Sequence, residues 1–359
     1  MKGKDLIMEL LIKRTYRSIK RKKNLFFAKN DYHVPFVTRM KYAFKGFTPN
    51  EYVWLDLANN DYRDYISDYQ RVNSREINGA YKIILDDKLL FEEIFRRYAR
   101  VPAVYAWVSD GVVYGIHEYE VDNSSVLEFI RKRSCVVLKW ETGYEGKGTY
   151  IIRAAEGNES GFSVNGKNVS AQKLLELFSK PGQAILCEFM QQSGFEHELY
   201  PDSTNTIRMI CEKKKDEKTA HVVKAAQRIG NHKSAPLDNV SAGAISCEID
   251  IDSGKLLAGV VAKTEHNSGD NRFFDTHPDS GAVLTGREIP DWQNLKKEIE
   301  DLTNQFPYLN LVAWDVLLTD GGFCLIEGNA SSGLMMFQQR HGVRNEEIGD
   351  IYRSYGLIK

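Results

Sequence analysis

The chain has 359 residues, of which 42% are hydrophobic and 27% charged, so it can bury a sizeable core in two or three lobes. The formal net charge of -1 excludes a global attraction to nucleic acid or to acidic lipid. No apolar stretch approaches the length that spans a membrane. The five cysteines are scattered, odd in number and without the close spacing of metal-binding pairs. This pattern indicates reduced, buried thiols and a cytoplasmic protein.

Basic residues dominate the first thirty positions, where ten lysines and arginines face only Asp5 and Glu9. Apolar residues recur there at roughly helical spacing: Leu6, Ile7, Leu10, Leu11 and Ile19. This pattern predicts an amphipathic helix. Such a helix packs its apolar stripe on its own protein, which we favour, or rests on anionic lipid or an acidic partner at the inner face of a membrane.

Residues 1 to 80 predict a mainly helical region without the alternation of strands and helices of a βαβ unit. An amphipathic helix follows over Lys88–Arg97, and two strands within Val101–Tyr114 join at Asp110-Gly111. A further helix is predicted over Ser124–Lys132. This part of the chain therefore combines helices with short strands.

A strand over Cys135–Trp140 opens a region where strands dominate. Two helices interrupt it, near Ala171–Ser179 and Leu295–Gln305. The polar, Gly-rich stretch Asn267–Arg287 predicts one long loop, a common place for substrate contacts.

A strand lysine followed by a glycine-rich loop is the first pattern with chemical meaning. The strand delivers Lys139, and the loop carries Gly143, Gly146, Lys147 and Gly148. Glycines let backbone N–H groups approach phosphate oxygens, and the lysines add positive charge. The loop is neither a Walker A loop nor a dinucleotide fingerprint, so it is a phosphate loop of another kind or an ordinary hairpin loop.

A lone acid and two arginines follow on apolar strands. Glu188 in Ala184–Met190 is placed to accept a hydrogen bond from an adenine amino group or a ribose hydroxyl, or else is a surface acid. Arg208 and Arg228 each lie at or near a strand. Two such guanidinium groups would stabilise charge that develops in phosphoryl or acyl transfer, whereas each alone also fits an ordinary salt bridge.

Three polar residues interrupt the closing pair of apolar runs, Leu311–Leu318 and Phe323–Asn329. Asp315, Glu327 and Asn329 offer the hard oxygen ligands that suit Mg²⁺. Glu327 and Asn329 share a strand face. Asp315 joins that face only if the turn has three residues or the hairpin contains a bulge. Otherwise the segment is an edge hairpin whose acids face solvent.

The order of these signals resembles the ATP-grasp superfamily and, within it, the sugar-transfer-associated ATP-grasp family, which is related to α-L-glutamate ligases. The resemblance runs from about Tyr42 to the end of the chain. Its more particular signatures are Asp87-Lys88-Leu-Leu-Phe, Asn205-Thr-Ile-Arg208, Arg228-Ile-Gly with Asp238-Asn239, and His277-Pro-Asp-Ser-Gly281 with Ile289-Pro290.

The resemblance implies an α+β fold in which two lobes sandwich ATP. Residues 81–190 would form the small lobe with the phosphate loop, and residues 191–359 the large lobe with the metal site and the acceptor loops. The usual enzyme of this superfamily begins with a Rossmann-like lobe. Residues 1–80 depart from that pattern, so the identity of the acceptor does not carry over.

The resemblance also implies roles for single residues. Lys88, Lys139 and the Gly143–Gly148 loop would contact the ATP phosphates, and Arg228 and Lys139 the transferred group. The adenine and ribose side would be formed by Glu188, Phe189, Met190 and His197. Asp315, Glu327 and Asn329 would hold one or two Mg²⁺ ions. The acceptor side would be formed by Arg208, Asn205, Asn239 and His277.

The implied activity is an ATP-dependent ligase that activates a small-molecule carboxylate as an acyl phosphate and joins it to an amine or similar nucleophile. Cell-surface polysaccharide or natural-product biosynthesis is the implied setting, with no nucleic-acid partner. Two alternatives stay open: a kinase that phosphorylates a small molecule or sugar, and a non-catalytic nucleotide-binding scaffold.

Overall fold

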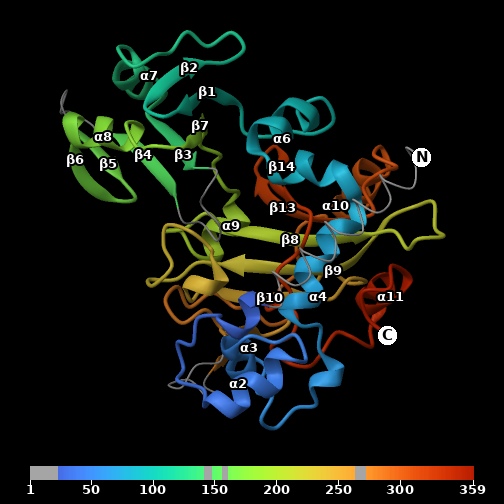
Figure 1. Cartoon of the computed structure of the whole chain (residues 1–359). Coiled ribbons are helices and arrows are strands. Elements are labelled where there is room, and N and C mark those ends of the chain that lie inside the picture. The colour runs from blue at the N-terminus through green and yellow to red at the C-terminus, as the bar shows by residue number, and fades with distance from the viewer. Residues whose placement is uncertain (1–22, 141–147, 156–160, 263–271) are drawn as a thin grey trace, which may run out of the picture.

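The computed structural model describes residues 23–140, 148–155, 161–262 and 272–359. Two seven-stranded antiparallel sheets form its framework, and helices from residues 23–95 lie below and beside the second sheet (Figure 1). Among the described residues, no helix combines the length and the hydropathy needed to cross a bilayer.

The N-terminal region is helical from residue 23 onward, whereas the amphipathic helix predicted from Leu6 to Ile19 lies outside the described residues. Its elements are α2 (Phe36–Ala43), α3 (Pro49–Trp54), η1 (Tyr62–Asp64), α4 (Asp68–Ser74) and η2 (Arg75–Lys82), where η marks a 3-10 helix. Capping boxes start α3 at Thr48 and α4 at Ser67, so side chains satisfy the first backbone N–H groups of both helices. A small core of Tyr42, Phe47, Leu55, Leu57 and Tyr65 holds the region together.

Two short helices, α5 (Ile83–Asp86) and α6 (Lys88–Phe95), connect this region to the first sheet. The Phe95 ring lies 5.1 Å from Trp314 and 4.9 Å from Phe306, both of which belong to the core of the second sheet. Residues 83–95 therefore pack with the large lobe, and the predicted start of the small lobe at residue 81 is wrong for this segment.

The first sheet contains β1 (Val104–Ser109), β2 (Val112–Gly115), β3 (Cys135–Trp140), β4 (Thr149–Ala154), β5 (Gly161–Val164), β6 (Lys167–Ser170) and β7 (Gln183–Glu188), in the order β2-β1-β7-β3-β4-β5-β6. Helices α7 (Val126–Arg133) and α8 (Ala171–Phe178) cover one face, where they pack on Val136 and Leu138. Since side chains alternate along a strand, Val137 and Lys139 point to the opposite face.

The second sheet contains β8 (Thr206–Glu212), β9 (His221–Ile229), β10 (Ile245–Ile249), β11 (Gly259–Val260), β12 (Phe273–Phe274), β13 (Leu311–Thr319) and β14 (Gly322–Asn329), in the order β12-β11-β10-β9-β8-β13-β14. Helix α10 (Trp292–Asn304) packs on one face and α11 (Glu347–Ser354) on the other. The short elements α9 (Gly194–Leu199) and η3 (Val240–Ala242) complete this lobe.

The predicted long loop Asn267–Arg287 is only partly a loop. Residues 263–271 lie outside the described residues, but Phe273–Phe274 form β12, which pairs with β11. The polar composition hid a two-residue strand that is too short to produce a pattern of its own.

Candidate functional site

A cavity of about 1410 Å³ lies where the two sheets and the N-terminal helices meet. Its wall includes Lys139 and Ile185 of the first sheet, Asp315 and Glu327 of the second, and Trp54 and Arg71 of the N-terminal helices. The two lobes and the helical region therefore all contribute side chains to one space.

The β13–β14 hairpin brings two carboxylates together by means of a bulge. Thr319 pairs with Gly322, so the turn has only two residues and the predicted three-residue loop is wrong. The register then shifts between Asp315 and Val316: Val316 pairs with Leu325, whereas Asp315 pairs with Glu327. One extra residue on β14 thus places Glu327 opposite Asp315, as the bulge alternative required.

Asp315 on β13 is fixed by two arginines, Arg208 on β8 and Arg228 on β9. The carboxylate accepts hydrogen bonds from Nε of Arg208, from Nη2 of Arg208 at 3.1 Å and from Nη2 of Arg228 at 2.9 Å. Asp315 is only 2% exposed, and burial alone would raise its pKa. The two guanidinium groups outweigh burial and hold the pKa of Asp315 at about 2.

Glu327 experiences the opposite balance. Burial and the adjacent Asp315 carboxylate raise its pKa, although Lys139 and Arg208 act against them. Asn329 donates a hydrogen bond from Nδ2 to Glu327 at 3.4 Å. The three predicted metal ligands therefore lie side by side at the cavity wall. The three residues offer oxygen ligands, and a cation would offset the repulsion between the carboxylates of Asp315 and Glu327 that raises the pKa of Glu327. The group therefore fits a site for a hard divalent cation.

The two predicted phosphate lysines line the same cavity. Lys139 lies on β3, opposite Thr149 of β4 and Ile185 of β7. Lys88 begins α6, where the Asp87 carboxylate caps the helix by accepting from the N–H groups of Leu89 and Leu90. Cys187 lines the same cavity, where burial raises the pKa of its thiol and the charges of Lys139 and Lys88 act against that rise.

An apolar slot beside Lys139 is a feature that sequence reasoning missed. Val104, Val137, Ile185 and Cys187 form a buried cluster that lines the cavity. Its signal was available, because Val137 lies two residues before Lys139 on the same face of β3 and Ile185 lies opposite Lys139. The slot has the apolar character that suits a purine ring.

Three of the four predicted adenine-side residues also line the cavity, but their side chains are partly occupied. Glu188 accepts a hydrogen bond from the N–H of Ala103 at 3.3 Å and lies 3.9 Å from the Arg100 guanidinium. The Phe189 ring lies under the Arg153 guanidinium at 4.6 Å. Met190 is buried with Leu317 and Cys324. These three consecutive residues leave the first sheet at the junction between the lobes.

Asn205 does not contact the cavity, contrary to the prediction. Its Oδ1 accepts from the Ser203 hydroxyl and from the N–H of Gly230, and its Nδ2 donates to the carbonyl oxygens of Glu196 and Tyr200. The side chain is fully buried and uses its whole hydrogen-bonding capacity to hold backbone. Asn205 is therefore a structural residue.

His277 is likewise structural. Its ring stacks on Tyr200, its Nε2 donates to the carbonyl oxygen of Gly230 at 2.8 Å, and its Nδ1 accepts from the N–H groups of Asp279 and Ser280. Burial lowers the pKa of His277, which favours the neutral ring that this pattern requires. The predicted substrate contact is wrong, because both nitrogens already have partners.

His197 does not reach the cavity either, since it lies exposed on α9 and is absent from the cavity wall. Asn239 does line the cavity and caps η3 through its side chain. Gly143, Gly146 and Lys147 lie outside the described residues. Gly148 closes the β3–β4 hairpin with a φ of 88°, and its carbonyl accepts from the N–H of Trp140. That backbone conformation is one that glycine adopts without strain.

The N-terminal helices contribute a wall that the sequence did not reveal. Trp54 donates from its indole N–H to the Tyr32 hydroxyl at 2.9 Å, and both residues line the cavity. Arg71 pairs with Asp68 on the same wall. Burial raises the pKa of Glu51 to about 8, and the Asp68 carboxylate reinforces the shift. Aromatic, acidic and basic groups thus surround the end of the cavity away from Lys139.

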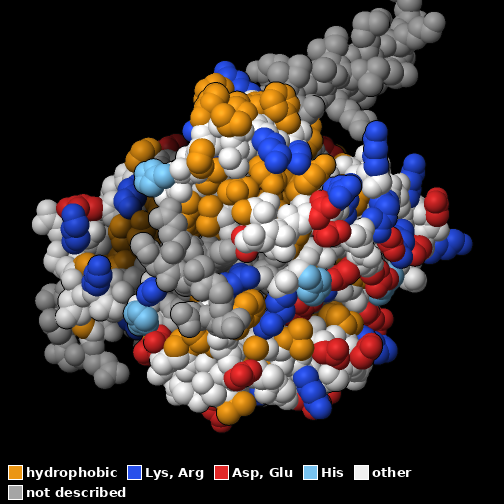
Figure 2. All heavy atoms as spheres, turned by 90° about the horizontal axis from the view of Figure 1, so that it is seen from below, with side chains coloured by type: hydrophobic (Ala, Val, Ile, Leu, Met, Phe, Trp, Pro, Cys, Tyr) orange, Lys and Arg blue, Asp and Glu red, His pale blue; other side chains and the backbone are white. Residues whose placement is uncertain are grey.

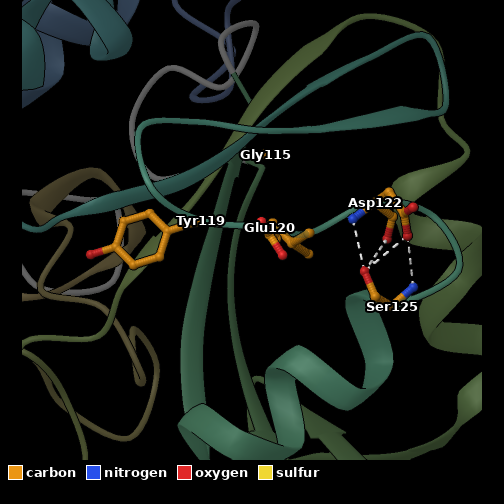
Figure 3. Close-up of a pocket in the computed structure, with 6 residues that line it drawn as sticks. Gly115, Tyr119, Glu120, Asp122 and Ser125 are labelled. Carbon is orange, nitrogen blue, oxygen red and sulfur yellow. Dashed lines mark hydrogen bonds between the residues drawn. The ribbon is translucent and has the colours of Figure 1, made fainter.

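A second, smaller hollow lies on the outer side of the first sheet, lined by Gly115, Tyr119, Glu120, Val121, Asp122 and Ser125 (Figure 3). Two of its polar groups bond to each other: the Asp122 carboxylate accepts from the N–H and the hydroxyl of Ser125, both at 2.9 Å. These bonds shape the chain before α7.

A family model for sugar-transfer associated ATP-grasp proteins matches residues 65–348. The chain belongs to the sugar-transfer associated ATP-grasp family. Its fold is the α+β ATP-grasp fold, as the sequence predicted. The match begins inside the N-terminal helical region, just before α4, so α2 and α3 precede the part that the family shares.

Solved structures of ATP-grasp proteins resemble this family member, and no curated protein sequence matches it. An ADP complex of N5-carboxyaminoimidazole ribonucleotide synthetase is 13% identical with a TM-score of 0.38, over 69% of this chain and 45% of that one. The ligase PsnB with a precursor peptide and AMPPNP is 12% identical with a TM-score of 0.38, over 78% and 61%. A Chryseobacterium gregarium RiPP-associated ATP-grasp ligase is 13% identical with a TM-score of 0.39, over 79% and 66%. The chain thus spans 45–66% of the length of these proteins.

Proposed function

We propose that this protein is an ATP-dependent ligase that activates a carboxylate as an acyl phosphate and joins it to an amine. One observation carries the proposal. The cavity combines a paired-carboxylate site, two lysines and two arginines with an apolar slot, all in a chain of the ATP-grasp family. This set matches the needs of phosphoryl transfer from ATP.

The nucleotide would lie along the first sheet. The purine ring would enter the slot of Val104, Val137 and Ile185, with the backbone of Phe189 and Met190 at its edge. The phosphates would extend toward Lys139 and Lys88. The positive charge of the lysines would stabilise the negative charge that develops on the β- and γ-phosphates as the bond between these two phosphates breaks.

Asp315, Glu327 and Asn329 would hold Mg²⁺, which when bound neutralises phosphate charge and orients the γ-phosphate. The chain's own arginines act next to this site. Arg208 and Arg228 bind Asp315 and keep positive charge where the transferred group would lie. Arg228 also donates to the Thr206 hydroxyl at 3.1 Å and lies 3.3 Å from Asp238, so three residues fix its guanidinium plane.

The acceptor acid and the amine would occupy the end of the cavity lined by the N-terminal helices. The Arg71 guanidinium suits a carboxylate, and Asp68 suits an ammonium group or hydroxyls. The described structure contains no paired cysteine, which agrees with the proposed cytoplasmic setting of ATP-dependent chemistry.

The test is product analysis with Mg-ATP and pools of candidate acids and amines, including short peptides. We expect an amide product together with ADP and free phosphate. A stable phosphorylated product without phosphate release would support the kinase alternative instead.

Two variants separate catalysis from folding. Glu327→Gln removes a charge at the proposed metal site and should reduce turnover by roughly a hundredfold or more. Asp320→Asn changes an exposed acid at the turn of the same hairpin and should leave turnover unchanged. If Asp315→Asn with Glu327→Gln preserved the cellular role of the protein, the scaffold alternative would replace the enzyme.

A further inference from the structure

The N-terminal helices carry the most exposed large hydrophobic side chains of the described chain. Phe44 is 80% exposed, Phe27 and Val37 are 78% exposed, and Phe36 is 67% exposed. The next value elsewhere in the described residues is 58%, at Val283. Four such side chains within eighteen residues form a feature that needs an explanation, because scattered single exposures are normal but gathered ones are not.

These side chains form one face. Phe36 and Met40 lie four residues apart on α2, and Phe44, the C-cap residue four positions further on, continues the same side of the helix. The Phe44 ring contacts Phe26 with centroids 5.1 Å apart, and Arg39 donates to the Phe26 carbonyl oxygen at 3.4 Å. Residues 26 and 27 are thereby held beside α2. We call the surface of Phe27, Phe36, Val37 and Phe44 the apolar face. Figure 2 looks onto this end of the molecule and shows hydrophobic side chains gathered there, with lysine and arginine around them.

The part of the sequence that contains this face differs sharply in charge from the rest of the chain. Residues 1–45 contain thirteen lysines and arginines but only three acids, Asp5, Glu9 and Asp31. The remaining residues hold 35 basic and 46 acidic side chains, so the near-neutral total conceals a strongly basic start. Within the described part of this segment, Lys23, Lys29 and Lys41 are exposed, and Lys29 pairs with Asp31 at 2.6 Å.

We propose that the apolar face docks on an anionic membrane surface. Aromatic rings insert at the boundary between headgroups and acyl chains, and basic side chains around them are attracted to anionic lipid. The combination fits a bilayer better than a second copy of this chain, because the second copy would bring the same positive charge to the contact. The proposal goes beyond the ligase function and does not depend on it.

Docking in this way would orient the cavity. The N-terminal wall of the cavity includes Ala28, Lys29 and Tyr32, which lie one to five residues after Phe27. The wall and the apolar face thus belong to one segment, so the end of the cavity proposed for the acceptor would lie close to the lipid headgroups.

The experiment is flotation of the full chain with vesicles of phosphatidylcholine, with and without phosphatidylglycerol. We expect flotation only with the anionic vesicles and a decrease as salt is raised. The variant Phe27→Ser/Phe36→Ser/Val37→Ser should reduce the partition coefficient about tenfold or more, because three exposed side chains lose their apolar area. It leaves Phe44 and its contact with Phe26 intact, so the helical region keeps its packing.

A matched control changes exposed hydrophobic side chains elsewhere. Leu257→Ser/Val283→Ser alters residues of the large lobe that are 40% and 58% exposed. This variant should float like the unmodified chain. Flotation of the triple variant equal to that of the control would overturn the proposal, as would failure of the unmodified chain to bind anionic vesicles. A concentration-dependent dimer that the triple variant abolishes, without lipid binding, would assign the face to a second copy instead.

Discussion

Asp315 and Glu327 face each other across one strand pair, yet they hold a proton with very different strength. Two guanidinium groups keep Asp315 ionised, whereas burial and the charge of Asp315 itself raise the pKa of Glu327. A bound divalent cation would favour the ionised form of Glu327 and so counteract the rise in pKa caused by burial and by Asp315. The pair therefore illustrates how two identical groups acquire separate roles from the neighbours that the strands supply.

Glu212 is a buried acid outside the cavity, and it predicts how stability depends on pH. Both of its carboxyl oxygens are buried without a hydrogen-bond partner, and burial with Glu347 nearby raises its pKa from 4.5 to about 9. The folded protein thus binds a proton that the unfolded chain releases above pH 4.5. Stability contributed by this group is fully present below that value and is lost as pH rises toward 9.

We expect Glu212→Gln, a neutral isostere, to raise the free energy of unfolding by about 1–3 kcal/mol near pH 8 and to change it little near pH 5. Urea denaturation at the two pH values measures the difference. Glu176→Gln on α8 is the control, because that glutamate is exposed and pairs with the equally exposed Lys173 on the same helix. A stabilisation of equal size at both pH values would contradict the assigned cause.

At the scale of elements, the cap of α6 links helix stability to the position of Lys88. The Asp87 carboxylate accepts from two backbone N–H groups at 3.0 and 2.8 Å. Asp87→Ala should lower the free energy of unfolding by about 1 kcal/mol, whereas Asp87→Asn should retain most of it, since both side chains offer an oxygen to the cap. Chemical denaturation of the three proteins provides the measurement. Equal loss in the alanine and asparagine variants would show that the negative charge, not the cap, matters.

Regular elements were predictable from the sequence because their periodicity is local. The strand predicted over Cys135–Trp140 has those bounds, and the helix predicted near Ala171–Ser179 spans Ala171–Phe178. The register of the closing hairpin was not decidable, because Asp320-Gly321-Gly322 permits a turn of two or three residues. The bulge on β14 depends on packing against the whole sheet, which no local pattern reports.

The candidate site was predictable where charged residues interrupt apolar strands, as at Lys139, Arg228, Asp315 and Glu327. The site was not predictable where polar side chains form hydrogen bonds with the protein's own backbone. Asn205 and His277 belong to family-like motifs, but their hydrogen bonds go to carbonyl and N–H groups of neighbouring loops. A sequence shows which groups can bond, and only the fold decides whether the partner is a ligand or the chain itself.

At the scale of the whole molecule, the helical N-terminal region forms a third wall of the cavity, in addition to the walls formed by the two sheets. Its helices α2 and α3 precede the part that matches the family, yet Trp54 of α3 lines the same cavity as Lys139 and Asp315. The Trp54 indole bonds to the Tyr32 hydroxyl, so the two aromatic side chains form a fixed surface. On the proposed function, this wall selects the acceptor and not the nucleotide.

Trp54→Ala should therefore raise the KM for the acceptor about tenfold and leave the KM for ATP and the affinity for Mg-ATP unchanged. The reason is that the alanine variant removes a large apolar surface at one end of the cavity while the apolar slot near Lys139 keeps all its contacts. Steady-state kinetics with each substrate varied in turn, together with calorimetric titration of Mg-ATP, measures both effects. Trp54→Phe is the control, because it keeps the ring and loses only the hydrogen bond to Tyr32, and it should lie near the unmodified protein. If Trp54→Ala changed both KM values equally, the helical region would stabilise the whole cavity instead of recognising the acceptor.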